Sequence, residues 1–346
     1  MEELETSDGR YEHCIKCVIC SRSINSDESF YHCDTCCYDL CSSCWKAQKK
    51  QSSEQFDSHD LCLASQAGDC DEVKKIINSG VDVNHGYVDG STPLHYAALK
   101  GHDACVGLLL EKGANPNQVN NKGKTALNCA VHSNSHSCAQ LLLEKGADPN
   151  LGRPLALAVS TNCVGILQLL LEKGANPNEG SGSSTPLEMA IALNDVECVR
   201  LLLDNGADPN LGDSLTSATF GGKVECLRLL LNKGVDLNRS EGIMLSAVFS
   251  NNVDCAKMLL EKGANPNAAD CVDQTPLHEA VKRDNYAMVK LLLEKGAKPN
   301  CVDKIGQSPL DICQNSEIEA LLKAHGGRKS SFLTKFVKRK QWEKKF

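Results

Sequence analysis

A phrase of ten residues recurs along most of this chain and limits its fold more than any other feature. It has the form Leu-Leu-Leu-Glu-Lys-Gly-Ala-Asn-Pro-Asn, with looser copies at both ends. Successive copies are 28 to 33 residues apart. A period of this length predicts a stack of repeats that bury a continuous core between neighbours. The glycine of the phrase stands at Gly80, Gly113, Gly146, Gly174, Gly206, Gly234, Gly263 and Gly296, and in a degenerate ninth copy at Gly326.

Each repeat reads as two short helices. In the second repeat, Thr92 is suited to cap a helix that begins at Pro93 and ends before Gly101, because proline at the first helical position loses no hydrogen bond. A second helix places leucines on one face and stops at Gly113, which can adopt the left-handed conformation. Neither helix reaches the ~12–15 residues at which an isolated helix is marginally stable in water. The stability of the chain should therefore come from stacking, with atypical repeats at the two ends.

The residues Thr-Pro-Leu-His-x-Ala at 92–97 and 275–280 resemble the hallmark of the ankyrin repeat, and weaker versions stand at 185–187 and 308–310. The resemblance covers residues 61–327. It implies an all-α fold, a solenoid of stacked helix pairs with short β-hairpin fingers, that binds protein partners.

The segments between repeats differ in length. Those after Gly146, Gly206 and Gly234 lack about five residues, so their fingers should be short. Fuller fingers at 117–124 and 267–274 are the better candidates for partner contact, although neutral variation of surface loops would also explain the difference. The candidate contact residues are Asn120, Asn121, Lys122, Asp270 and Asp273.

Twenty cysteines are present, but the acidic start of the chain shows no signal peptide and no apolar run approaches the ~20 residues that span a bilayer. Thiols or metal ligands in a reducing compartment are therefore expected. Eight cysteines lie within residues 14–44, and six of them form three C-x2-C pairs, the spacing that converges two sulfurs on one zinc. Three pairs predict two zinc ions, whose remaining ligands are His59 with Cys62, or His13 with Cys14. The pairs are Cys17 with Cys20, Cys33 with Cys36, and Cys41 with Cys44.

Residues 30–44 resemble the ZZ-type zinc finger, which ends in Tyr-Asp-Leu-Cys-x2-Cys. Four residues separate the second and third pairs where that family usually has five, and one histidine stands where it has two. The spacing also resembles C1 and DC1 fingers and, more distantly, the MYND finger. The ZZ resemblance implies one zinc held by Cys17, Cys20, Cys41 and Cys44, and another held by Cys33, Cys36, His59 and Cys62. It also implies peptide binding through Asp34 and Asp39.

Several other residues are expected to be structural. Cys62 also occupies a position in the first repeat where a small buried residue is expected. Cysteines that stand eight residues before the repeat glycine should be buried, since equivalent positions in stacked repeats lie ~8–10 Å apart, too far for a disulfide. In the ankyrin family the histidines of the hallmark phrase, His95 and His278, brace the backbone. These cysteines are Cys105, Cys138, Cys198, Cys226 and Cys255.

The formal charge of -7 is unevenly distributed, because residues 328–346 carry eight Lys or Arg against the single Glu343. The acidic remainder makes nucleic-acid binding by the repeats improbable. The basic segment has an apolar stripe that suits an anionic membrane, a partner's groove or a nuclear address, and a solubilising disordered end fits equally well.

The sequence thus predicts a disordered start at 1–10, a zinc finger at 11–60, about nine ankyrin repeats at 61–327 and a basic tail at 328–346. No catalytic motif is recognisable, so we expect a protein-binding adaptor or scaffold and not an enzyme. The alternatives are an accessory component of a ubiquitin ligase and a nuclear regulator that sequesters transcription factors. The expected location is the cytoplasm, with the nucleus as the alternative.

Overall fold

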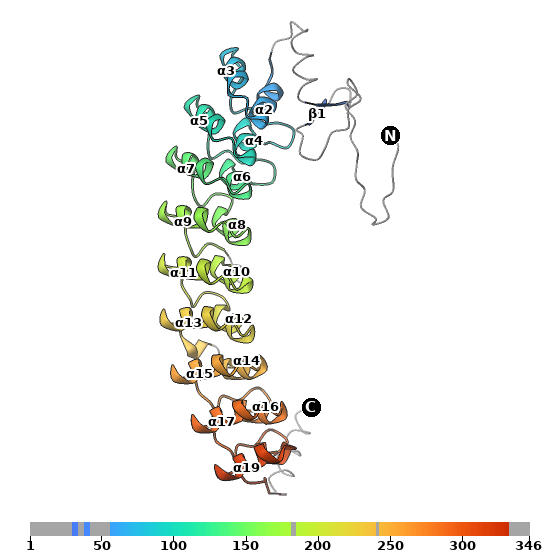
Figure 1. Cartoon of the computed structure of the whole chain (residues 1–346), viewed down its shortest axis with the longest axis vertical. Helices are drawn as coiled ribbons and strands as arrows, with labels where there is room; N and C mark the ends of the chain where they lie inside the picture. Colours follow the sequence, from blue (N-terminus) through green and yellow to red (C-terminus); the bar gives the residue numbers. More distant parts are fainter. Residues whose placement is uncertain (1–29, 34–37, 42–55, 181–184, 240–241, 332–346) are drawn as a thin grey trace. The chain divides into compact units, whose positions relative to one another are not determined.

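The computed structural model describes residues 30–33, 38–41, 56–180, 185–239 and 242–331. The chain divides into two compact units, an N-terminal unit at Met1–Ala175 and a C-terminal unit at Asn176–Phe346. Within each unit the helices form successive antiparallel pairs (Figure 1). Over the described residues, no helix is long and apolar enough to cross a membrane.

The described residues of the N-terminal unit form two short antiparallel strands and four helix pairs. Strand β1 (Phe30–Cys33) pairs with β2 (Tyr38–Cys41), and the register places Phe30 opposite Cys41. The first helices of the pairs lie side by side in one row and the second helices in another (Figure 1). The pairs are α2 (Ser58–Ala67) with α3 (Cys70–Asn78), α4 (Pro93–Lys100) with α5 (Asp103–Glu111), α6 (Ala126–His132) with α7 (His136–Glu144), and α8 (Pro154–Ser160) with α9 (Val164–Glu172).

The C-terminal unit repeats the same arrangement. Its last pair is atypical, as expected for the end of a stack, because α18 is only four residues long. The pairs are α10 (Pro186–Leu193) with α11 (Val196–Asp204), α12 (Ser214–Phe220) with α13 (Val224–Asn232), α14 (Ile243–Phe249) with α15 (Val253–Glu261), α16 (Pro276–Lys282) with α17 (Tyr286–Glu294), and α18 (Pro309–Ile312) with α19 (Ser316–Ala324); a 3-10 turn, η1 (Leu237–Arg239), precedes α14.

The helix boundaries confirm the sequence signals. Thr92 caps α4, Pro93 is its first residue, and Gly101 ends it in the left-handed conformation with φ of 72°. The leucine faces are buried against neighbouring pairs, and the column of cysteines that includes Cys105 and Cys255 is fully buried, as expected. Burial is the main cause that raises the pKa of the Cys255 thiol to about 11.

The finger loops correct one expectation. In the repeats, the described finger residues form turns and no β-strand, so the β-hairpin prediction is wrong. In the finger at 117–124, Asn120 N–H donates to the Lys124 carbonyl at 2.9 Å, and the Asn120 side-chain oxygen accepts from the N–H groups of Lys122 and Lys124 at 3.0 Å. The side chain thereby binds backbone N–H groups that a strand ladder would use.

The prediction of short fingers is confirmed. The connections 112–125 and 262–275, which carry the fuller fingers, are each 14 residues long. The connections 145–153 and 205–213 have nine residues, and 233–242 has ten.

Polar side chains join each first helix to the loop of the next repeat. His95 Nδ1 accepts from the Thr92 N–H at 3.1 Å, so its Nε2 carries the proton and donates to the Lys124 carbonyl at 2.9 Å. His278 makes the same contacts with Thr275 and Gln307. The expectation that these histidines brace the backbone is confirmed.

In other repeats a different side chain stands at the position of His95 and also joins the first helix to the next loop. Asn128 accepts from the Thr125 N–H at 3.0 Å and donates through Nδ2 to the Gly152 carbonyl at 3.0 Å. The Glu188 carboxylate accepts from the N–H groups of Thr185 at 3.1 Å and of Asp213 in the next loop at 2.7 Å. The link therefore requires a side chain that bridges two backbone sites, and it does not require an imidazole.

The last asparagine of the ten-residue phrase makes a second link between repeats. Asn117 Nδ2 donates to the Gly146 carbonyl at 2.9 Å, and its Oδ1 accepts from the Asp148 N–H at 2.7 Å. Asn117 therefore binds one carbonyl and one N–H group of the following repeat. The same pattern recurs at Asn84, Asn178, Asn267 and Asn300.

Replacing His95 and His278 by asparagine should preserve these links and reduce sensitivity to acid. Burial lowers the pKa of both histidines below the ordinary 6.5. The unfolded chain therefore binds more protons, and the stability that these groups provide is present above pH 6.5 and lost as pH falls below it. Urea unfolding at pH 7.5 and 5.5 should show a smaller loss for H95N/H278N than for the native chain. Equal losses in both proteins would contradict this account.

Candidate protein-binding surface

The predicted contact residues of the N-terminal unit lie in the finger at 117–124. The Asn121 N–H donates to the Asp89 carbonyl at 2.9 Å, and its side chain donates to the Val88 carbonyl at 3.1 Å. Asn120 Nδ2 donates to Ser91 Oγ at 3.1 Å. These two asparagines therefore hold adjacent fingers together, whereas the side chain of Lys122 is exposed at the tip.

The finger at 267–274 in the C-terminal unit is built in a similar way. The Asp270 carboxylate accepts from the N–H groups of Val272 and Gln274 at 2.9 and 2.8 Å. Asp273 is exposed at the tip with φ of 59°, and the Lys304 N–H of the next finger donates to the Val272 carbonyl at 3.0 Å. Asp270 shapes the loop, and Asp273 lies at its exposed tip.

A row of exposed apolar side chains lies on the first helices of the C-terminal unit. Leu193, Phe220 and Phe249 are the last residues of α10, α12 and α14, which are successive neighbours, and their exposed fractions are 57%, 63% and 42%. We call these three residues the apolar row. The sequence analysis did not predict this row. A signal for it was present, since the last residues of other first helices are polar: His132, Ser160 and Lys282.

Arg283 holds one end of the apolar row in place. It caps α16, its Nε lies 2.6 Å from the carboxylate of buried Glu279, and its guanidinium lies 4.9 Å from the ring centre of Phe249. A cation over an aromatic face is attractive. The guanidinium therefore covers part of the Phe249 ring, while the residue stays 42% exposed.

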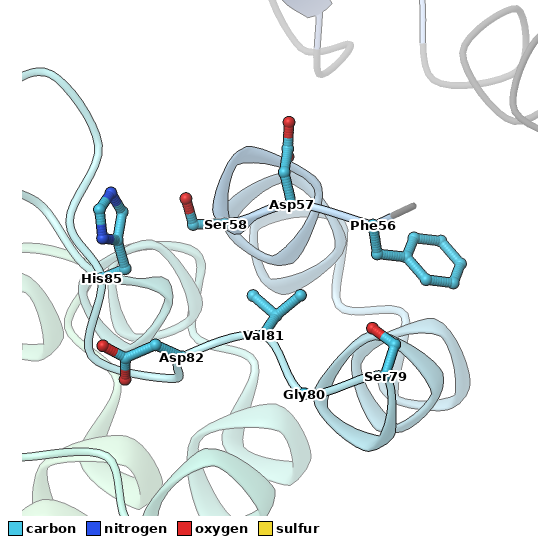
Figure 2. Close-up of a pocket in the computed structure, with 8 residues that line it drawn as sticks. All are labelled: Phe56, Asp57, Ser58, Ser79, Gly80, Val81, Asp82 and His85. Carbon is cyan, nitrogen blue, oxygen red and sulfur yellow. The ribbon is translucent and has the colours of Figure 1, made fainter. Parts of the chain in front are cut away.

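A small pocket of about 260 Å³ lies at the start of the repeats. Figure 2 shows that three of its lining residues, Phe56, Asp57 and Ser58, come from the start of α2, and that the others follow α3. Its two carboxylates already serve the backbone, because Asp57 accepts from Asp60 N–H and Asp82 from Asn84 N–H, both at 2.9 Å. The pocket therefore supports no catalytic assignment.

The register of β1 and β2 places two of the predicted zinc ligands along the chain. Cys33 lies opposite Tyr38, and Cys41 lies opposite Phe30, so the two cysteines stand three positions apart along the ladder. Their assignment to different zinc ions stays a prediction from the sequence.

His59 and Cys62, the predicted ligands from α2, have different surroundings. The His59 ring stacks on Tyr87 with centroids 4.9 Å apart, and among the described residues its buried Nδ1 has no hydrogen-bond partner. An unpartnered ring nitrogen suits a metal ligand. Cys62 is 3% exposed, and burial first, then Asp89 and Asp57, raise the pKa of its thiol to about 12. These surroundings favour the interpretation of Cys62 as a core residue.

The remaining predicted residues of the zinc finger include one in a described strand. Asp39, predicted to bind a peptide, lies in β2 opposite His32. In the described part of the chain, no three His, Cys, Asp or Glu side chains form a metal-binding group. Cys17, Cys20, Cys36, Cys44 and Asp34 lie outside the described residues.

The comparisons with known proteins agree with the repeats. A family model described as ankyrin repeats (3 copies) matches residues 61–153, 151–213, 214–270 and 243–329. The chain therefore belongs to the ankyrin-repeat family, whose repeats serve protein–protein interaction.

Two curated relatives match short segments of the chain. An ankyrin repeat-containing protein of Saccharomyces cerevisiae is 44% identical over 16% of this chain, and myotrophin of Xenopus tropicalis is 46% identical over 15%. These matches span 11% and 44% of the relatives' own lengths. The human ASB11 ankyrin repeat domain is 27% identical and has a TM-score of 0.36, with coverage of 78% of this chain and 98% of that chain.

Zinc analysis of the full-length protein should separate the two predicted sites. We expect two zinc ions per chain by elemental analysis, and one after C17S/C20S or after C33S/C36S, because each pair belongs to a different ion. C271S is the matched control, since Cys271 is an exposed cysteine of the repeats. A native content of zero, or an unchanged content in both double variants, would refute the zinc prediction.

Proposed function

We propose that this chain is a protein-binding adaptor that holds one partner on the apolar row, and that its N-terminal segment is a zinc-binding module for a second peptide or protein. The apolar row is the observation on which the first part depends. The second part rests on the three C-x2-C pairs of the sequence.

The composition of the row supports its role in binding. Exposed large aromatic side chains are favourable anchors at protein interfaces, where they fill pockets on a partner. Fully burying one such side chain is worth about 1.5–3 kcal/mol. Two such rings, Phe220 and Phe249, end the neighbouring helices α12 and α14, and Leu193 ends the next helix, α10, so one partner can contact all three.

The partner would approach the side of the repeats where each first helix leads into its second helix. Phe220 and Phe249 are the last residues of α12 and α14, at the ends that lead into α13 and α15. The connections of nine and ten residues join the opposite ends of α12 and α14, so the fingers lie away from the row.

No observation on the described residues favours the alternatives, an accessory ubiquitin-ligase component or a nuclear regulator. A cytoplasmic location, with the nucleus as the alternative, remains a prediction from the sequence. Residues 328–331 of the basic segment contact the last repeat, where Ser330 Oγ donates to the Asp311 carboxylate at 2.6 Å. The rest of that segment, with its predicted membrane or anionic partner, lies outside the described residues.

Removing two aromatic rings from the apolar row should abolish capture of the partner. We expect F220A/F249A to weaken binding about 10- to 1,000-fold, because interface anchors typically contribute 1–2 kcal/mol or more each. Proteins captured from lysate by the native chain would be compared with those captured by the variant, and affinities then measured by calorimetry.

Tyr286→Ala provides the matched control, because Tyr286 is a similarly exposed aromatic residue on a second helix of the same unit. It should retain every specific partner. Retention of the same partners at the same affinity by F220A/F249A would place the interface elsewhere.

A further inference from the structure

Cys70 and Cys105 bring their sulfur atoms to 2.7 Å from each other in adjacent repeats. Cys70 is the first residue of α3, and Cys105 is the third residue of α5. A disulfide bond has a sulfur separation of ~2.05 Å and forms only where the backbone already holds two cysteines close together. The separation of 2.7 Å brings these two sulfurs within reach of such a bond.

The pair is a feature of one repeat junction in this chain. Cys70 is the first residue of the second helix in its repeat, and Cys105 is the third residue of the second helix in the next repeat. At later junctions these positions hold Asp103 with Cys138, or Val224 with Cys255. Asp103 raises the pKa of the Cys138 thiol, although less than burial does, which agrees with the same proximity there. Only the first of these junctions provides two sulfurs.

We propose that Cys70 and Cys105 are a site of reversible disulfide formation that joins the first two repeats. The contact favours this over a metal site, since within the described residues no third Cys, His, Asp or Glu completes a metal-binding group with them. The inference does not depend on the proposed partner.

Cys70 is more exposed than Cys105, and this difference determines which thiol reacts first. Cys70 is half-buried and Cys105 is fully buried, so an oxidant in solution reaches Cys70 first. Burial, and then the contact with Cys70, raise the pKa of the Cys105 thiol to about 12. Cys105 is therefore suited to react second, with a sulfur that is already next to it.

The oxidant is a low-molecular-weight disulfide such as glutathione disulfide. The Cys70 thiolate attacks one sulfur of the oxidant, a mixed disulfide forms, and one glutathione thiolate leaves. Cys105 loses its proton and attacks the Cys70 sulfur, so the bond to glutathione breaks and the protein disulfide forms. Two protein thiols are oxidised by two electrons, one glutathione disulfide is reduced to two glutathione molecules, and these take up the two protons.

The bond would restrain the end of the stack. The first repeat has a neighbouring repeat on one side, so its helices should open more readily than those further along the array. A covalent link from α3 to α5 limits this opening. Excess thiol would reverse the effect, which makes the junction responsive to redox conditions.

The test uses the zinc-loaded full-length protein and glutathione disulfide. After treatment, free thiols are alkylated under denaturing conditions, and tryptic peptides are sequenced by mass spectrometry. We expect a cross-link between the peptides 51–74 and 101–112, with fragment ions that assign it to Cys70 and not to Cys62 on the same peptide. The cross-link should persist in C198S, which changes a buried cysteine of the same column, and vanish in C70S.

Hydrogen exchange provides the second measurement. Peptides from α3 should exchange at least tenfold more slowly in the oxidised than in the reduced native chain, as expected for a bond that restrains opening. Dithiothreitol should restore the faster exchange. Glutathione on Cys70 with Cys105 recovered as a free thiol, or both cysteines recovered as free thiols, would overturn the proposal.

Discussion

The coupling of each short helix pair to the next is the interaction on which this molecule depends. Helices of four to ten residues are not stable alone in water, so a repeat folds only against its neighbours. Buried leucine faces provide the main driving force for this stacking, but apolar contact alone does not fix the position of the connecting loops. The asparagine that ends each phrase, exemplified by Asn117, and the bridging side chain exemplified by His95 add that positional constraint.

Leucine faces hold the helices together and polar side chains hold the loops in position, and this explains how the chain presents binding surfaces. Backbone hydrogen bonds and side chains such as Asn120 and Asp270 hold the fingers in shape, which leaves their tips exposed on a rigid base. The first helices contribute the apolar row, whose Phe249 is partly covered by the neighbouring Arg283. A surface ordered in advance loses less conformational entropy when it binds, which favours tight protein recognition.

Much of the repeat architecture could be predicted from the sequence, because its signals are local. Threonine with proline fixes helix starts, glycine fixes helix ends, and leucine spacing identifies the buried faces. The turn structure of the fingers could not be predicted in this way, since side-chain hydrogen bonds from residues such as Asn120 compete with strand pairing. The contact of Cys70 with Cys105 and the apolar row were also missed, because each depends on packing between positions about 30 residues apart.

Polar side chains couple one repeat to the next, and the variant Asn117→Ala tests this coupling most directly. The substitution removes two hydrogen bonds to the following repeat, so urea unfolding should show a loss of about 1–2 kcal/mol. Exchange of the Asp148 amide, which donates to Asn117, should become faster. Lys122→Ala, at an exposed side chain of the same finger, should leave both unchanged. An Asn117→Ala protein with native stability and native exchange at Asp148 would contradict the account.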